Sequence, residues 1–195
     1  KVSRLCREHN ILLSMDEVQT GFGRTGRNFA HQLFGVKPDI MGCGKAAGGG
    51  ILPLSFVAGR DDVLGVLTPG SEGSTFGGYP LASVVGTYAI KVMVDENLAE
   101  KAETRGAQLI SNLKDIQGQF PEKIKEVRGK GLLTAFEMFN EKYLDGHKVS
   151  VGLMDRGVYA KETHHTTVRL APALTIGSEQ IDKLSEAVKD VVASL

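Results

Sequence analysis

The chain has 195 residues, which is enough for one or two domains with a buried core. Lys plus Arg and Asp plus Glu each number 23, so no overall charge favours nucleic acid or a membrane surface as a partner. No apolar run is long enough to span a membrane. The two cysteines, Cys6 and Cys43, fit a reduced intracellular protein, cytoplasmic by default or in the mitochondrial matrix of a eukaryote.

The first 79 residues alternate short helical and strand patterns. Apolar spacing predicts a helix over residues 1–9 and another near Phe29, which the Lys37-Pro38 pair ends. Short apolar runs bounded by glycine or polar residues are typical of buried strands in a parallel sheet. Such runs predict strands at Ile11–Met15, Ile40–Gly44 and Leu54–Ala58.

The remaining residues begin with two long helical patterns that Pro80 opens and Pro121 ends, broken at residues 95–97. Shorter patterns follow, and the chain closes on a helix that opens at Ser178. They predict strands at Leu132–Met138, Val158–Ala160 and Thr167–Leu170, and a helix at Val149–Arg156. Strands and helices alternating beside a separate small domain indicate an α/β chain.

Two of the predicted strands end in residues that could form a site. The first runs into Asp16, and the second runs through glycines into Lys45. Ligands of open α/β sheets bind beyond the carboxyl ends of the strands, so a carboxylate and an amine should meet in one crevice.

Three kinds of site are compatible with this pair. A buried ion pair is the simplest. A nucleotide site would need the phosphate loop G-x-x-x-x-G-K-[ST], but Asp39 stands at its first glycine and Ala46 follows the lysine. A pyridoxal phosphate site would use a desolvated lysine amine and a carboxylate that keeps the pyridine nitrogen protonated. The nearby glycines would let the backbone approach a flat ring.

Three segments carry a resemblance to a known family. In order, DEVQTGFGRTG, PDIMGCGKAAGGG and GSEGSTFGGYPLA resemble the class III aminotransferases of fold type I, which use pyridoxal 5'-phosphate. The later segments VRGKGLL and VYAKETHHTTVRLAPALTI are most similar to the ornithine δ-aminotransferases within that class. The resemblance covers essentially the whole chain, with departures at Leu52, Tyr79 and Ala46-Ala47.

The resemblance implies a role for each matched residue. Lys45 would be the catalytic lysine that binds the cofactor, Asp16 would pair with its pyridine nitrogen, and Gln19 would bond its phenolic oxygen. Ser74 and Thr75 would contact the cofactor phosphate of the neighbouring subunit in a homodimer with shared active sites. Arg169 would bind a substrate carboxylate.

The resemblance also implies a domain plan and a reaction. The chain would be the C-terminal portion of a longer enzyme. It would comprise the end of the large mixed-sheet domain (residues 1–79), a helical connection (80–120) and a small α+β domain (121–195). The enzyme would move the δ-amino group of ornithine to 2-oxoglutarate. The alternatives are an acetylornithine or 4-aminobutyrate aminotransferase, or an incomplete fragment that acts only as an association domain.

Two further motifs are interpreted as structural. Gly21, Gly23 and Gly26 imitate a dinucleotide fingerprint, but weak helical periodicity after them favours a coincidental loop. His164-His165 could suggest a metal pair, yet neighbours on a strand point to opposite faces and no Cys or carboxylate cluster completes a site.

Overall fold

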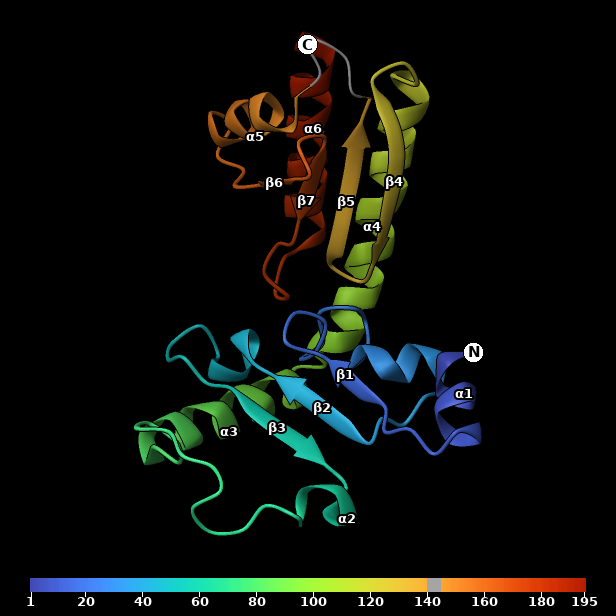
Figure 1. The fold of residues 1–195 in the computed structure, drawn as a ribbon. Coiled ribbons are helices and arrows are strands. Elements are labelled where there is room, and N and C mark those ends of the chain that lie inside the picture. Colours follow the sequence, from blue (N-terminus) through green and yellow to red (C-terminus); the bar gives the residue numbers. More distant parts are fainter. Residues whose placement is uncertain (140–144) are drawn as a thin grey trace. The chain divides into compact units, whose positions relative to one another are not determined.

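The chain folds into two compact units, seen in the computed structural model, which describes residues 1–139 and 145–195 (Figure 1). The first unit comprises Lys1–Gly23 and Arg27–Leu98, and the second comprises Arg24–Gly26 and Ala99–Leu195. Helix α3 therefore belongs to the first unit and nearly all of α4 to the second. The boundaries expected after residues 79 and 120 stay a prediction. No described helix combines the length and the apolar character that crossing a membrane requires.

The first unit is built on a three-stranded mixed sheet, which is the sheet type that the resemblance implied. Its strands are β1 (Ser14–Asp16), β2 (Ile40–Cys43) and β3 (Phe56–Gly59), in the order β1-β2-β3. β1 and β2 run parallel, whereas β3 is antiparallel to β2. Residues Ile11–Leu13, predicted as strand, lie outside β1, because pairing with β2 begins only at Ser14.

Short helices connect and flank these strands. They are α1 (Val2–Glu8), the 3-10 helices η1 (Ala30–Phe34) and η2 (Lys45–Gly48), α2 (Asp61–Leu64) and α3 (Pro80–Asp95). The first helix and the long helix with proline in its first turn are confirmed. Helix α2 was not predicted, because four residues are too few to show helical periodicity.

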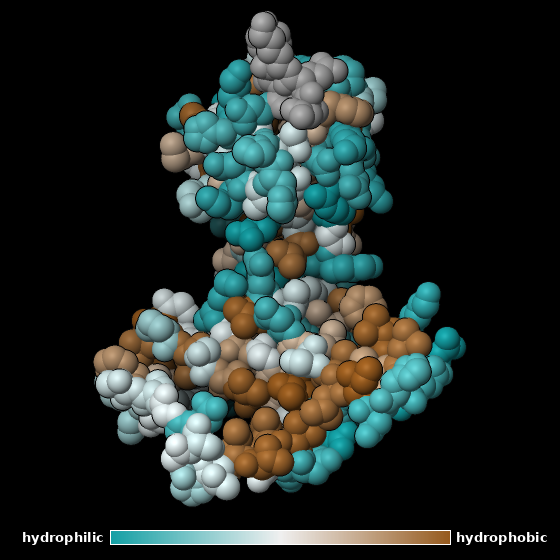
Figure 2. Space-filling view, in the orientation of Figure 1, coloured by the Kyte–Doolittle hydropathy of each residue, from teal (hydrophilic) through white to brown (hydrophobic). Residues whose placement is uncertain are grey.

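The expectation that these strands are buried is wrong for this chain. Val57 of β3 is 59% exposed, and Ser14 and Asp16 are exposed as well. Figure 2 shows hydrophobic residues gathered on the surface of this unit. The described elements of the unit are too few to cover the sheet. Exposed apolar strand residues of this kind are typical of interaction surfaces.

The second unit contains a four-stranded antiparallel sheet of order β4-β5-β7-β6. Its strands are β4 (Ile124–Lys130), β5 (Leu133–Met138), β6 (Lys161–Thr163) and β7 (Thr167–Leu170), and its helices are α4 (Leu98–Gln119), α5 (Gly146–Met154) and α6 (Ser178–Ser194). The predicted strand at Val158–Ala160 is wrong, because pairing with β7 starts only at Lys161. Strand β4 was missed, whereas β7 was predicted with its observed bounds.

The core of this unit lies between the sheet and the helices. Fully buried side chains from both layers pack together, among them Leu109, Leu113, Phe136, Val168, Leu170 and Val188. Because side chains alternate along a strand, burial of Val168 and Leu170 places Arg169 on the opposite face of the sheet.

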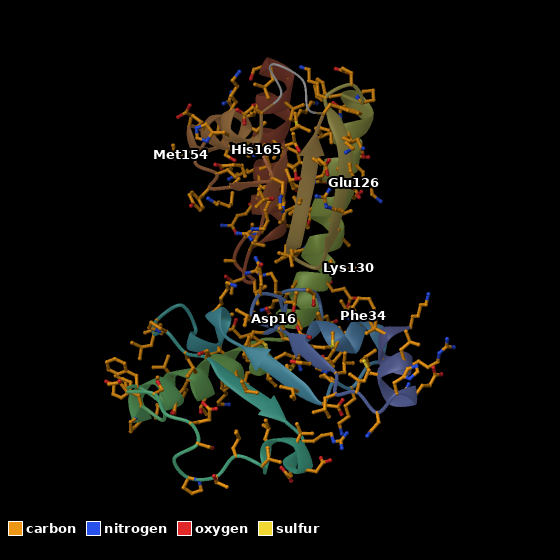
Figure 3. The ribbon with its side chains drawn as sticks, in the orientation of Figure 1. Asp16, Phe34, Glu126, Lys130, Met154 and His165 are labelled. Atoms are coloured by element: carbon orange, nitrogen blue, oxygen red, sulfur yellow. The ribbon has the colours of Figure 1, made fainter. Side chains whose placement is uncertain are left out.

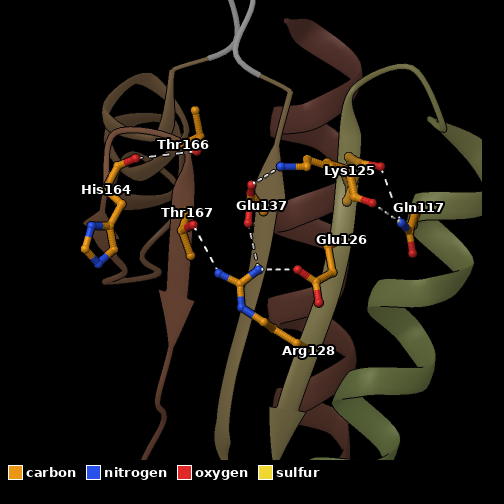
Figure 4. Close-up of polar contacts among 9 residues, drawn as sticks. Gln117, Lys125, Glu126, Arg128, Glu137, His164, Thr166 and Thr167 are labelled. Carbon is orange, nitrogen blue, oxygen red and sulfur yellow. Dashed lines mark hydrogen bonds and ion pairs between the residues drawn. The ribbon is translucent and has the colours of Figure 1, made fainter.

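That outer face carries a network of charged side chains (Figure 4). Arg128 Nη1 lies 2.7 Å from Glu126 Oε2 and 2.8 Å from Glu137 Oε2. The hydrogen bond to Glu137 raises the pKa of Arg128. Hydrogen bonds from Lys125 and Arg128 lower the pKa of Glu137. Arg128 is therefore structural, and it links β4 with β5.

Two glycines of α4 differ in how much space surrounds them for a side chain. A Cβ atom added to Gly106 would lie 2.0 Å from the carbonyl oxygen of Gly131, in the turn between β4 and β5. A Cβ added to Gly118 would meet nothing within 4 Å. The backbone contact at Gly106 is what lets α4 approach that turn.

We expect Gly106→Ala to lower the free energy of unfolding by at least about 1–3 kcal/mol, because backbone must move to admit the methyl group. Gly118→Ala is the matched control in the same helix and should raise the free energy by up to about 1 kcal/mol, through helix propensity. Urea unfolding monitored by circular dichroism measures both. Equal effects of the two substitutions would contradict the close contact at Gly131.

Candidate functional site

Asp16 and Lys45 lie at neighbouring strand ends in the first unit. Asp16 is the last residue of β1 (Figure 3), and its Cα pairs with that of Gly42 in the parallel register. β2 ends one residue later at Cys43, and Lys45 begins η2. The carboxyl ends of two parallel strands therefore deliver both residues to the same edge of the sheet, as the sequence predicted.

Lys45 adopts a backbone conformation that is unusual for its residue type. Its φ is 46°, in the left-handed region that favours glycine. Such strain is concentrated at functional sites. Both Lys45 and Asp16 are exposed, and within the described part of the chain they form no ion pair with each other. The hypothesis of a buried ion pair is therefore not what this structure shows.

Glu17 holds the turn that follows Asp16, a role that the sequence did not reveal. Its carboxylate is buried and accepts hydrogen bonds from the backbone N–H groups of Ala30, at 3.0 Å, and His31, at 2.8 Å, and from the hydroxyl of Thr20. Burial alone would raise the pKa of Glu17, but these hydrogen bonds together lower it. Gln19 lies exposed within the turn that Glu17 and Thr20 brace.

Ser74 and Thr75 lie in an exposed loop between α2 and α3. Ser74 lines a cavity of about 420 Å³ together with Leu52, Tyr79 and Ser83. Leu52 and Tyr79 are two of the positions at which the sequence departs from the resembling family. Both departures therefore line one cavity beside the loop expected to contact phosphate.

Arg169 lies in the second unit, in the middle of the β5-β7-β6 region. Its Cα pairs with Ala135 on one side and with Lys161 on the other. The side chain is half-buried, and among residues 1–139 and 145–195 no hydrogen bond or ion pair engages its guanidinium group. A guanidinium group without a partner among the described residues can bind an anion through its N–H donors.

His164 and His165 lie in a turn and not on a strand, and the predicted strands at Val158–Ala160 and Thr167–Leu170 also leave them outside. They form the turn between β6 and β7, with φ of 52° and 65°. The argument from opposite strand faces therefore does not apply to them. The described residues contain no group of three or more His, Cys, Asp or Glu side chains placed to hold a metal ion.

Comparison with known proteins adds to this geometry. Residues 1–192 match the family described as aminotransferase class-III. The chain belongs to the class III aminotransferases. This finding confirms the predicted resemblance, and the solved structures of class III aminotransferases confirm the expected fold, which is one portion of fold type I.

Three relatives show how far the similarity extends. The chain is 43% identical over 193 residues to ornithine aminotransferase, mitochondrial, of Oryza sativa subsp. japonica, a match that covers 98% of this chain and 41% of the rice protein. It superposes on ornithine aminotransferase from Plasmodium yoelii with a TM-score of 0.94 at 39% identity, covering 99% and 50% of the two chains. Acetylornithine aminotransferase from Elizabethkingia anophelis gives 0.92 at 38% identity, covering 99% and 48%. The chain thus spans about half the length of these relatives.

Proposed function

We propose that the protein containing this chain is a pyridoxal phosphate-dependent aminotransferase. The residues present fit that cofactor by their chemistry. An amine at Lys45, a carboxylate at Asp16, an amide at Gln19 and hydroxyls at Ser74 and Thr75 all lie exposed in the first unit. They supply the groups that an aldehyde, a pyridine nitrogen, a phenolic oxygen and a phosphate require. The observation that carries the proposal is the parallel β1–β2 edge that brings Asp16 and Lys45 together.

The bound cofactor supplies a cationic ring that withdraws electrons from the carbon bearing the transferred amine. Lys45 would hold the cofactor through its Nζ atom and then, as a free amine, move the proton at that carbon. Its position at the start of η2, directly after Gly44 and the end of β2, supports this role.

The other residues would orient and hold the cofactor. The Asp16 carboxylate would keep the ring nitrogen protonated, and Gln19 would donate to the phenolic oxygen. Ser74 and Thr75 would donate to the phosphate bound by a second copy, so the enzyme would be a homodimer with shared sites. The exposure of their whole loop in this chain supports that role, because a second copy could reach it.

The proposed reaction transfers the δ-amino group of ornithine to 2-oxoglutarate, giving glutamate semialdehyde and glutamate. The names of the rice and Plasmodium relatives support ornithine as the donor. Acetylornithine is the second candidate donor, because the Elizabethkingia enzyme is similar to nearly the same degree.

The environment of Arg169 supports a role toward the 2-oxo acid. 2-Oxoglutarate carries a carboxylate beside its reacting carbon, whereas the δ-carbon of ornithine has none. A guanidinium fork binds a carboxylate through two parallel hydrogen bonds. Arg169 has no acidic partner within the described residues that would occupy that fork.

We expect Arg169→Lys to damage the 2-oxoglutarate half-reaction far more than the ornithine half-reaction. Lysine keeps the charge but cannot reproduce the fork, and loss of the pair should cost roughly 2–5 kcal/mol in the first of these. Rapid-mixing kinetics of each half-reaction, measured separately on the full-length protein loaded with cofactor, gives the two rates.

The matched control is Arg156→Lys. Among the residues that the structure describes, the Arg156 guanidinium donates to the Gly152 carbonyl of α5, at 3.0 Å, and to no other group, so both half-reactions should keep their rates. Equal losses in both half-reactions with Arg169→Lys would remove this residue from the substrate site and with it the proposed selectivity.

A further inference from the structure

The segment Arg24–Gly26 packs within the second unit, although the residues on both sides of it belong to the first. The Leu132 N–H donates to the Arg24 carbonyl at 3.0 Å. A Cβ atom at Gly131, whose φ is 53°, would lie 2.5 Å from the carbonyl carbon of Thr25. The segment is therefore fitted closely against the turn between β4 and β5.

The Arg24 side chain joins two backbone carbonyls rather than an acid. Its Nη1 atom donates to the carbonyl oxygen of Leu132 at 3.1 Å and to that of Pro172 at 2.6 Å. Burial lowers the pKa of Arg24, but an arginine keeps its charge at any physiological pH. Both acceptors therefore receive a charge-assisted hydrogen bond, which is stronger than an ordinary one.

The two carbonyls lie opposite each other two positions beyond the last pair of the β5–β7 ladder. The last paired residues of that ladder are Thr134 and Leu170, and Thr134 Oγ1 donates to the Leu170 carbonyl at 3.0 Å. Continuing the antiparallel register by two residues on each strand brings Leu132 opposite Pro172. Proline has no N–H group and cannot donate a ladder hydrogen bond. Arg24 supplies a donor to both carbonyls where the strands cannot pair directly.

These two hydrogen bonds from Arg24 lie just beyond the end of β7, the strand that carries Arg169. Arg169 pairs with Ala135, one position inside the last ladder pair, and lies three residues before Pro172. Without the two hydrogen bonds from Arg24, the Pro172 carbonyl would no longer be held by a side chain. The end of β7 could then separate from β5. A displacement of about 1 Å in a substrate-positioning group reduces rates by up to about 100-fold.

We propose that Arg24 is a positioning residue for Arg169. By fixing the end of β7 from outside the ladder, it holds the guanidinium of Arg169 where the 2-oxo acid carboxylate binds. This inference rests on the proposed function of Arg169 and adds a residue to it that the sequence patterns did not indicate.

The test replaces Arg24 with methionine, which keeps an unbranched apolar stem and removes every donor. We expect the KM for 2-oxoglutarate to rise about 10- to 100-fold, while the rate of the ornithine half-reaction stays within about twofold. Amide hydrogen exchange of residues 167–171 should become faster in the same variant, with or without cofactor. Arg24→Lys, which keeps a charged donor, should recover part of the affinity for 2-oxoglutarate.

Arg156→Met is the control, because it also removes an arginine–carbonyl hydrogen bond, but a local one from the turn after α5 to a carbonyl four residues back in that helix, and it should change neither half-reaction. Equal slowing of both half-reactions by Arg24→Met, an unchanged KM, or the same selectivity in Arg156→Met would overturn the inference. If the methionine variant does not fold, Arg24→Lys alone decides by the same criteria, with a smaller rise in KM expected.

The same assays on Arg169→Lys separate the two proposals. If Arg169→Lys is not selective for the 2-oxo acid, the proposed function of Arg169 fails. If Arg169→Lys is selective and Arg24→Met is not, only the positioning role of Arg24 fails.

Discussion

Replacement of Lys45 by alanine should reduce transamination by roughly 100- to 10,000-fold, the range by which a positioned acid–base group accelerates proton transfer. The physical reason is that Lys45 lies two residues after the end of β2, where it meets the end of β1 that carries Asp16. Saturating cofactor should not restore the rate, because the substitution removes the group that moves the proton. Single half-reactions followed by cofactor absorbance measure the loss.

Lys37→Ala is the matched control for this experiment. Lys37 is an exposed lysine of the same unit that precedes β2 instead of following it, so its removal should leave the rate within about twofold. Added methylamine should partly restore turnover in the Lys45 variant, because a small amine can take the vacated position. A Lys45→Ala variant with normal turnover would show that another group moves the proton.

Replacement of Asp16 by asparagine should weaken catalysis without removing cofactor attachment. A neutral amide cannot hold the ring nitrogen in its protonated form. Loss of one partner from a charge pair shielded from water costs about 2–5 kcal/mol, which corresponds to roughly 30-fold to several thousand-fold in rate. The rate should be measured with cofactor in saturating excess, so that weaker binding does not contribute.

The control for Asp16 is Asp61→Asn, which neutralises an exposed acid in the first turn of α2 in the same unit. Its effect should be small in both rate and thermal stability. Near-normal turnover of Asp16→Asn at saturating cofactor would exclude Asp16 as the partner of the ring nitrogen.

Elements with a clear apolar period could be predicted from the sequence. β7 was predicted with its observed bounds, because buried Val168 and Leu170 alternate with Arg169. The final helix was predicted to open at Ser178, which is the first residue of α6, and its buried face includes Ile181, Leu184 and Val188. Periodicity reports which face of an element is buried, and these faces lie in the core of the second unit.

β4 could not be predicted in the same way. The strand carries charged residues at most positions, three of which (Lys125, Glu126 and Arg128) form ion pairs, and a register shift between Ile124 and Glu126 interrupts its alternation. The error at Val158–Ala160 has a related cause, because strand β6 is defined by hydrogen bonding to β7 and not by its apolar content.

The residues of the candidate site also differ in how far the local sequence could predict them. Asp16 and Lys45 were found because each follows a strand pattern, so their meeting at one edge follows from local sequence. Arg24 escaped notice because its partners, Leu132 and Pro172, lie 108 and 148 residues away along the chain. Contacts at such separations depend on tertiary structure, and no local pattern reports them.

The central claim is that Lys45 is the residue that binds pyridoxal phosphate. Borohydride reduction of the full-length protein in the presence of the cofactor fixes the cofactor to the amine that holds it, and peptide mass mapping then identifies the labelled residue. The account predicts the label on the peptide that contains Lys45, and on no peptide of the Lys45→Ala variant. A label on another lysine, such as Lys37, or a protein that takes up no label at all, would contradict it.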